Sequence, residues 1–214
     1  PLTGIGAGIQ YLKRSIEFDE EQIASIESIM SEVSRLDRII SDLFKVAKPR
    51  DILYQKTDVS KIIEKSYNSV REILRENSVE FETQVDEDMP EVEIDPDQIS
   101  QVLINLMKNS AESIEGEGGR VVVSAGVDGK AEPDNKKAAG RFRIKVIDNG
   151  CGIDENNIDR IFEPFYSGKS NGTGLGLYIS HSIIQHHHGR IEVESEAGKG
   201  TAFTLILPTG KYGG

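Results

Sequence analysis

Two parts of the sequence carry residues that could bind a charged ligand, and the first is the segment 101–114. Its apolar residues recur at helical spacing, while Asn105 and Asn109 share the opposite, polar face with Lys108 and Glu112. An ordinary amphipathic surface helix would explain the Lys and the Glu. It explains the two Asn less well, because Asn is unfavourable in the middle of a helix. The segment therefore predicts a helix whose Asn pair has a chemical task.

The second part runs from an apolar strand over 142–147 through Asp148 and a glycine turn to the glycine loop 172–176. Glycines let backbone N–H groups approach a ligand, and a helix N-terminus adds partial positive charge, so a glycine loop that opens a helix suits a phosphate. The pattern alone is weak, because flexible turns also collect glycine. It is not a Walker loop, because Thr173-Gly174 replaces the Gly-Lys that such a loop needs. It is not a dinucleotide loop either, because it follows a polar segment and not a first parallel strand.

The order of these motifs resembles the ATP-binding domain of sensor histidine kinases. The matching residues are Asn105 and Asn109 for the family's N box, Asp148-x-Gly150-x-Gly152 for its first glycine box, Phe162-x-x-Phe165 for its F box, and Gly172-x-Gly174-x-Gly176 for its second glycine box. The resemblance covers residues 58 to 208 and extends in part to residue 1. The chain departs from the family pattern at Gly168, which replaces a common Thr, and its short segment before Gly172 is similar to the nitrogen-regulatory branch.

The resemblance implies a role for each site residue. Asp148 would accept a hydrogen bond from the adenine amino group, while Asn109, supported by Asn105, would supply oxygen to a Mg²⁺ ion that bridges the phosphates. Lys169 and the second glycine box would meet the β- and γ-phosphates. The predicted catalytic residues are Asn105, Asn109 and Lys169, and the two Asn are also the predicted metal ligands. The predicted nucleotide-binding residues are Asp148, Gly150, Gly152, Ile153, Phe165, Lys169, Gly172, Thr173, Gly174, Leu175, Gly176 and Leu177. Phe162 and Phe165 are expected mainly to pack their segment against the domain.

The implied activity is phosphoryl transfer from ATP to a protein histidine, and from there to an Asp of a response regulator receiver domain. Related ATPases place a Glu where Asn105 stands, to activate water, so a water-activating ATPase is a disfavoured alternative. A non-catalytic nucleotide-binding scaffold is the third reading. In the family the acceptor His lies in a pattern His-Glu-x-x-x-Pro-Leu. Because Pro1-Leu2 match its last two residues, we expect the acceptor to precede this chain.

Apolar residues at heptad spacing run through the first part of the chain. One seam consists of Leu2, Ile5, Ile9, Leu12 and Ile16, and after a turn at 18–21 a second consists of Ile23, Ile26, Met30, Val33, Leu36, Ile40, Leu43 and Ala47. An antiparallel helical hairpin cannot bury both seams alone, so we predict a homodimer held by a four-helix bundle. The alternative is a helix pair that packs on the globular domain of its own chain.

The remaining sequence predicts an α+β fold. The resemblance implies a Bergerat-type ATP-binding fold, a two-layer α/β sandwich in which helices cover one face of a mixed sheet. A helix capped by Thr57 or Asp58 is expected to run through Arg75, and Asp95-Pro96 should begin the helix with the Asn pair, which we expect to stop at Gly116. Strands are expected over 79–85, 92–94, 120–127, 141–147, 190–195 and 201–207. The predicted domains are the hairpin over 1–48, a linker over 49–57, the ATP-binding domain over 58–210 and a tail over 211–214.

Composition narrows the classes of partner. A net charge of −11 argues against nucleic acid, and a single cysteine, Cys151, rules out a disulfide within the chain. No apolar run reaches the roughly 18 residues of a membrane span, so we expect no membrane contact within this segment. The expected location is cytoplasmic, which leaves open a membrane-bound sensor part upstream. The run His186–His188 could suggest a metal site, but adjacent helical side chains point to different faces. We expect instead a helix end with Gly189 as its terminator.

Overall fold

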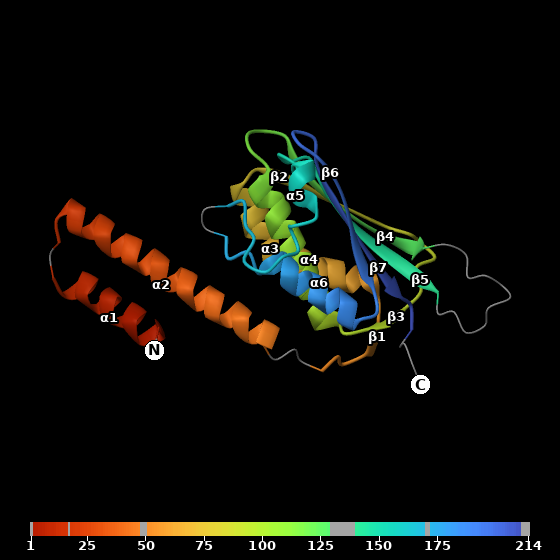
Figure 1. The fold of residues 1–214 in the computed structure, drawn as a ribbon, viewed down its shortest axis with the longest axis horizontal. Helices are drawn as coiled ribbons and strands as arrows, with labels where there is room; N and C mark the ends of the chain where they lie inside the picture. The colour runs from red at the N-terminus through yellow and green to blue at the C-terminus, as the bar shows by residue number, and fades with distance from the viewer. Residues whose placement is uncertain (1, 17, 48–50, 129–139, 170–171, 211–214) are drawn as a thin grey trace. The chain divides into compact units, whose positions relative to one another are not determined.

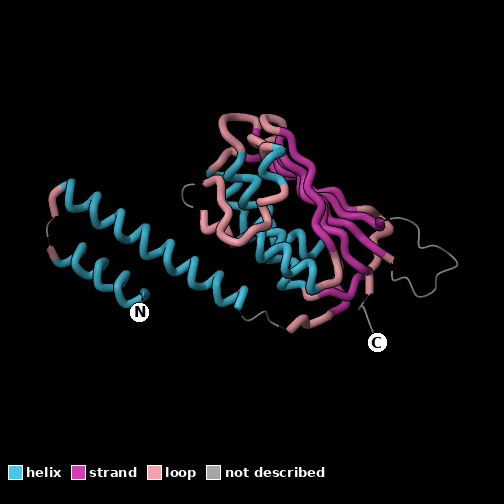
Figure 2. Tube along the Cα trace, in the orientation of Figure 1, coloured by secondary structure: helices cyan, strands magenta, loops and turns pink. Residues whose placement is uncertain are grey.

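The structure is a computed structural model that describes residues 2–16, 18–47, 51–128, 140–169 and 172–210. The chain forms two compact units, one of Pro1–Arg50 with Pro164–Gly176 and one of Asp51–Glu163 with Leu177–Gly214. The first contains a pair of helices and the second a sheet with helices (Figures 1 and 2). Within the described ranges, no helix is long and apolar enough to cross a membrane. The predicted tail over 211–214 lies outside them.

Helices α1 (Leu2–Ser15) and α2 (Glu20–Ala47) run antiparallel and contact each other, which forms the predicted hairpin (Figure 1). A reciprocal cap begins α2: Asp19 Oδ1 accepts the N–H of Gln22 at 2.8 Å, and Gln22 Oε1 accepts the N–H of Asp19 at 3.1 Å. Lys13 and Glu27 form an ion pair between the two helices at 2.8 Å. The turn expected at 18–21 is thus where the second helix starts.

A five-stranded mixed sheet forms the second unit, in the order β2-β4-β5-β7-β6. Its strands are β2 (Val79–Val85), β4 (Gly119–Asp128), β5 (Arg141–Asp148), β6 (Arg190–Glu196) and β7 (Gly200–Pro208). Only the pair of β2 with β4 is parallel. Burial alternates along β5, where Phe142, Ile144 and Val146 are buried and Arg141 and Arg143 are exposed. One face of the sheet therefore packs on the core, while the other faces solvent.

Helices α3 (Val59–Glu76), α4 (Pro96–Ser113) and α6 (Gly176–His186) lie on the buried face of the sheet (Figure 1). The first two begin at the predicted caps. Asp58 accepts the N–H of Ser60, and Asp95 accepts the N–H groups of Asp97 and Gln98. The two-layer α+β prediction is confirmed, and each predicted strand is present to within one residue at either end.

Part of the predicted linker over 49–57 forms regular structure. Residues 49 and 50 lie outside the described ranges, but Gln55–Thr57 form strand β1, which pairs antiparallel with β3 (Val92–Ile94). In addition, the N–H of Leu53 donates to Asp95 Oδ2 at 3.0 Å. The second half of the predicted linker is therefore part of the sheet-containing unit. So short a strand has no periodicity of its own and forms only because β3 supplies its hydrogen bonds.

The ends of two helices also differ from the prediction. Helix α4 stops at Ser113, before the expected Gly116, because Ile114 is extended and the carbonyl of Ser113 accepts the N–H of Cys151 at 2.9 Å. At the end of α6 the left-handed residue is His188, with a φ of 57°. The N–H of Gly189 bonds to the carbonyl of Ile184 at 2.9 Å, in the pattern of a Schellman motif. Gly189 is instead needed for space, since a Cβ there would lie 2.5 Å from the carbonyl oxygen of Ile206.

Candidate functional site

Asp148 is the buried acidic residue at the end of β5, with 7% of its surface exposed. Its Oδ1 accepts the backbone N–H groups of Gly150 at 3.0 Å and Thr201 at 3.1 Å, and its Oδ2 accepts the hydroxyl of Ser110 at 2.7 Å. The bond from Gly150 closes an Asx turn, the local structure expected of an Asp two residues before a glycine. Three donors thus fix the carboxylate in one orientation at the carboxyl end of a central strand.

The glycines after Asp148 are required by the packing of the backbone. A Cβ at Gly150 would overlap the hydroxyl of Ser113 and lie 2.8 Å from its carbonyl oxygen, so the turn docks directly on the last turn of α4. Gly152 has a φ of 69°, and a Cβ there would lie 2.8 Å from the carbonyl carbon of Glu196, the last residue of β6. Both glycines therefore position Asp148 whatever ligand is bound. Ile153, the next predicted residue, donates its N–H to Ser195 Oγ at 2.8 Å.

Asn105 and Asn109 are half-buried on the same face of α4. The Nδ2 of Asn105 donates to the hydroxyl of Ser180 on α6 at 3.0 Å, which leaves its Oδ1 as the amide atom with spare acceptor capacity. For Asn109, the described part of the chain offers its side chain no hydrogen-bond partner. Mg²⁺ prefers oxygen ligands, and an amide oxygen in this setting is a suitable one. The donor set of the two Asn therefore fits such an ion.

Apart from Leu177, the other predicted site residues belong to the segment 164–176, which groups with the helical hairpin. Phe165 and Gly174 tie its two ends together: the N–H of Phe165 donates to the carbonyl of Gly174 at 3.0 Å, and both residues have positive φ, 66° and 67°. Thr173 Oγ1 accepts the N–H of Leu175 at 3.3 Å, and the carbonyl of Lys169 accepts the N–H of Gly172 at 3.2 Å. Gly176 begins α6, and Leu177 belongs to the sheet-containing unit.

The two aromatic residues of the predicted F box differ in their surroundings. The ring centroids of Phe162 and of His181 on α6 are 5.0 Å apart, whereas 62% of the surface of Phe165 is exposed. Phe165 also has a left-handed backbone conformation, with a φ of 66°. For a bulky residue this conformation is uncommon and strained.

Three buried polar residues were missed by the sequence analysis: Ser110 and Thr201, which contact Asp148, and His187, which lies away from it at the end of α6. Ser110 and Thr201 hold the carboxylate of Asp148 from two directions. His187 connects α6 to Asp95, the N-cap of α4, through a hydrogen bond of 3.3 Å. Ser110 directly follows Asn109 and could have been noticed as a polar residue on the apolar side of the helix. Nothing in the local sequence marks the other two.

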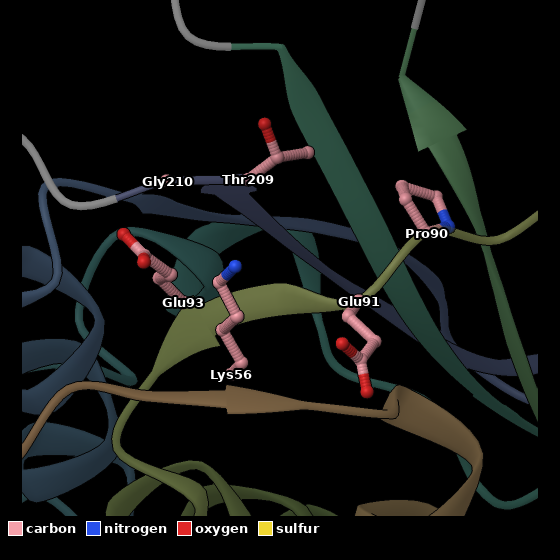
Figure 3. Close-up of a pocket in the computed structure, with 6 residues that line it drawn as sticks. All are labelled: Lys56, Pro90, Glu91, Glu93, Thr209 and Gly210. Carbon is pink, nitrogen blue, oxygen red and sulfur yellow. The ribbon is translucent and has the colours of Figure 1, made fainter.

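An open depression of about 420 Å³ lies elsewhere in the same unit, beside strands β1 and β3 (Figure 3). It contains none of the predicted site residues and is lined by Lys56, Pro90, Glu91, Glu93, Thr209 and Gly210. Across the described ranges, no group of three or more His, Cys, Asp or Glu side chains is placed to hold a metal ion. The predicted site thus depends on amide, backbone and single carboxylate groups.

Comparisons with known proteins agree with this arrangement. Residues 94–211 match the family described as "Histidine kinase-, DNA gyrase B-, and HSP90-like ATPase". The chain is 35% identical over 208 residues to sporulation kinase E of Bacillus subtilis (strain 168), and this alignment covers 97% of this chain and 27% of that protein. It is 33% identical over 208 residues to the sensor histidine kinase ZraS of Escherichia coli (strain K12), and this alignment covers 97% of this chain and 42% of that protein. The chain thus spans less than half the length of either relative.

Solved structures show the same similarity. The catalytic domain of histidine kinase ThkA is 29% identical, with a TM-score of 0.61 over 74% of this chain and 97% of that one. Histidine kinase ThkA in complex with response regulator protein TrrA is 28% identical, with a TM-score of 0.72 over 98% of this chain and 57% of that one. The chain therefore belongs to the family of histidine kinase-, DNA gyrase B- and HSP90-like ATPases, and its ATP-binding domain is that of a sensor histidine kinase.

Proposed function

We propose that the chain binds ATP with Mg²⁺ and presents the γ-phosphate to a histidine on a dimerisation helix, from which an Asp of a response regulator receives it. The observation that carries this proposal is the buried carboxylate of Asp148, which accepts three hydrogen bonds, one of them from Ser110 on the helix that contains both Asn residues. The structure of ThkA with its response regulator TrrA supports the choice of partner.

Asp148 would recognise the base. Its carboxylate is held from three sides, so the lone pair that remains on Oδ2 has a fixed direction. A fixed acceptor in a buried position binds a donor such as the adenine amino group without paying for its own reorientation. Gly150, Gly152 and Ile153 contribute by keeping the backbone of this turn in place.

Asn109 and Asn105 would hold the metal ion, and the segment 164–176 would hold the phosphates. Mg²⁺ supplies charge neutralisation between the β- and γ-phosphate oxygens when it is bound. The N–H groups of the glycine loop 172–176 and the N-terminus of α6 are suitable anion donors, and Lys169 adds a cation.

Transfer is favoured over hydrolysis by the chemistry of Asn105. An amide cannot take a proton from water at neutral pH, and the Nδ2 of this one already donates to Ser180. A water-activating ATPase would need a carboxylate in that position. A non-catalytic scaffold remains the other alternative, because every His of the chain lies at or after His181 and none is in the helical hairpin.

The hairpin supports a homodimer. On α2 the apolar residues Ile29, Leu36, Ile40 and Leu43 are exposed at heptad spacing, and the last three belong to the predicted seam of that helix. An exposed apolar stripe of this kind is typical of a helix that packs on a partner helix. A second copy of the chain would cover it and complete a four-helix bundle.

One experiment separates the three functions. The chain is incubated with γ-labelled ATP and Mg²⁺, alone and with a separate dimerisation domain that carries the His-Glu-x-x-x-Pro-Leu pattern. A kinase transfers acid-labile label to the added His, with little release of phosphate in its absence. Steady release of phosphate without the acceptor would indicate a water-activating ATPase. Binding of ADP without turnover in either reaction would indicate a scaffold.

A further inference from the structure

The two oxygens of Asp148 differ in their protein partners. Oδ1 accepts two backbone N–H groups, from Gly150 and Thr201, and so uses both of its lone-pair sites. Oδ2 accepts one hydrogen bond, from the hydroxyl of Ser110 at 2.7 Å. One lone-pair site on Oδ2 is therefore left for a ligand, and Ser110 decides where it points.

We propose that Ser110 is a positioning residue that aims Asp148 Oδ2 at the exocyclic amino group of a purine. This inference rests on the proposed nucleotide-binding function. Ser110 is 1% exposed, so it acts through Asp148 without needing to touch the ligand. Its single hydroxyl proton is used on Asp148, because the other neighbour, Ser113, donates to the carbonyl of Ser110 and not to its hydroxyl.

The arrangement gives a physical basis for base selection. The terminal torsion of an Asp side chain is broad, so without the Ser110 hydroxyl only Oδ1 would hold the carboxylate plane. With it, Oδ2 is a fixed acceptor that pairs with an amino group and is repelled by a keto oxygen at the same position. Ser110 also directly follows Asn109 on α4, so one helix sets both the acceptor for the base and the proposed metal ligand.

Ser100 provides a matched control. It lies on the same helix, is 2% exposed, and its hydroxyl lies 2.9 Å from that of Ser66 on α3. Ser100→Ala therefore removes a buried serine hydroxyl from α4 without affecting Asp148. Ser110→Cys keeps a side chain of similar size, but its thiol is a weaker donor than a hydroxyl. It provides the comparison if Ser110→Ala fails to fold, which thermal unfolding reveals.

The test is calorimetric titration with Mg–ADP and with purine riboside diphosphate, which lacks the amino group. We expect Ser110→Ala to weaken ADP binding about tenfold, the range of one hydrogen bond, and to leave the affinity for purine riboside diphosphate unchanged. The affinity of Ser110→Cys for ADP should lie between those of the parent and Ser110→Ala. Ser100→Ala should bind both ligands with the affinities of the parent. If the parent prefers ADP and Ser110→Ala keeps the same ratio of the two affinities, the role of Ser110 is refuted while the proposed function stands. If the parent binds neither ligand, the proposed function fails, and this inference fails with it.

Discussion

His187 joins the end of α6 to the start of α4. Its Nε2 accepts the backbone N–H of Asp95 at 3.3 Å, and its Nδ1–H donates to the carbonyl of Ile183 at 2.9 Å. The ring is 1% exposed. Because a protonated imidazole has no acceptor, this pair of bonds requires the neutral form. Burial lowers the pKa of His187 from its ordinary value, and the neighbouring His186 and His188 lower it further. The Ile183 carbonyl and the Asp95 carboxylate raise this pKa, but their effects are weaker than that of burial.

The stability of the sheet-containing unit should therefore depend on pH through His187. The unfolded chain binds the proton more readily than the folded chain. The contribution of His187 is thus complete above the ordinary value of 6.5 and is lost as the pH falls through the lower folded pKa. Urea unfolding of the parent and of His187→Gln is compared at a pH above 6.5 and at an acidic pH below it. His187→Gln should lose less stability than the parent between the two. The exposed His186 is the control: His186→Gln should unfold with the pH dependence of the parent. An unchanged pH dependence in His187→Gln would exclude the buried ring as its cause.

Replacing Asp148 by Asn should weaken nucleotide binding. The amide keeps the size of the side chain, but its Nδ2 is a donor where the adenine amino group needs an acceptor. Loss of a hydrogen bond to a charged group costs about 1.5–3 kcal/mol, roughly a ten- to hundredfold loss of affinity for Mg–ADP by calorimetry. Asp88→Asn removes the same charge from an exposed position and should bind like the parent. Equal affinity in the two variants would remove the basis for assigning the base to Asp148.

Gly150→Ala should destabilise the sheet-containing unit, because the added Cβ meets the backbone of Ser113 at 2.8 Å. Neither the end of α4 nor β5 can move freely, so we expect the cost of an overpacked site, about 1–3 kcal/mol in the free energy of unfolding. Gly168→Ala is the matched variant, since a Cβ there has nothing within 4 Å. Chemical denaturation of both variants measures the difference. Similar stabilities would mean that the turn is not docked on α4 as described.

Leu36→Glu should disrupt the proposed homodimer. Leu36 is exposed on the apolar stripe of α2, and burying a leucine against a partner is worth about 1.5–3 kcal/mol per chain. Two such losses in a symmetric dimer, with an unpaired charge in their place, should weaken association by at least about a hundredfold in sedimentation. Ser31, also exposed, lies on the opposite face of α2, and Ser31→Glu should leave the association unchanged. Identical sedimentation of the parent and Leu36→Glu would exclude this stripe as the dimer surface.

Local chemistry determined much of this fold. The Asp58 and Asp95 caps, the alternation along β5 and the heptads of α2 are patterns within one helix or strand, and each predicted an element that the structure contains. Motif order placed the Asn pair and Asp148 in one site, and the structure brings α4 and the end of β5 together through Ser110. Elements whose stability comes from within a short stretch of chain can be predicted from that stretch.

Contacts between distant residues were decided by the tertiary structure. Ser110 and Asp148 are 38 residues apart, and Asp95 and His187 are 92 apart. Strand β1 exists because β3 pairs with it, and Gly150 is required because Ser113 occupies the space of a side chain. Periodicity and capping describe neighbours in sequence, whereas the partner of a buried hydroxyl or imidazole depends on which elements pack together. The sequence therefore predicted the carboxylate and its turn, and only the packing of α4 against β5 decided which of its oxygens is left for a ligand.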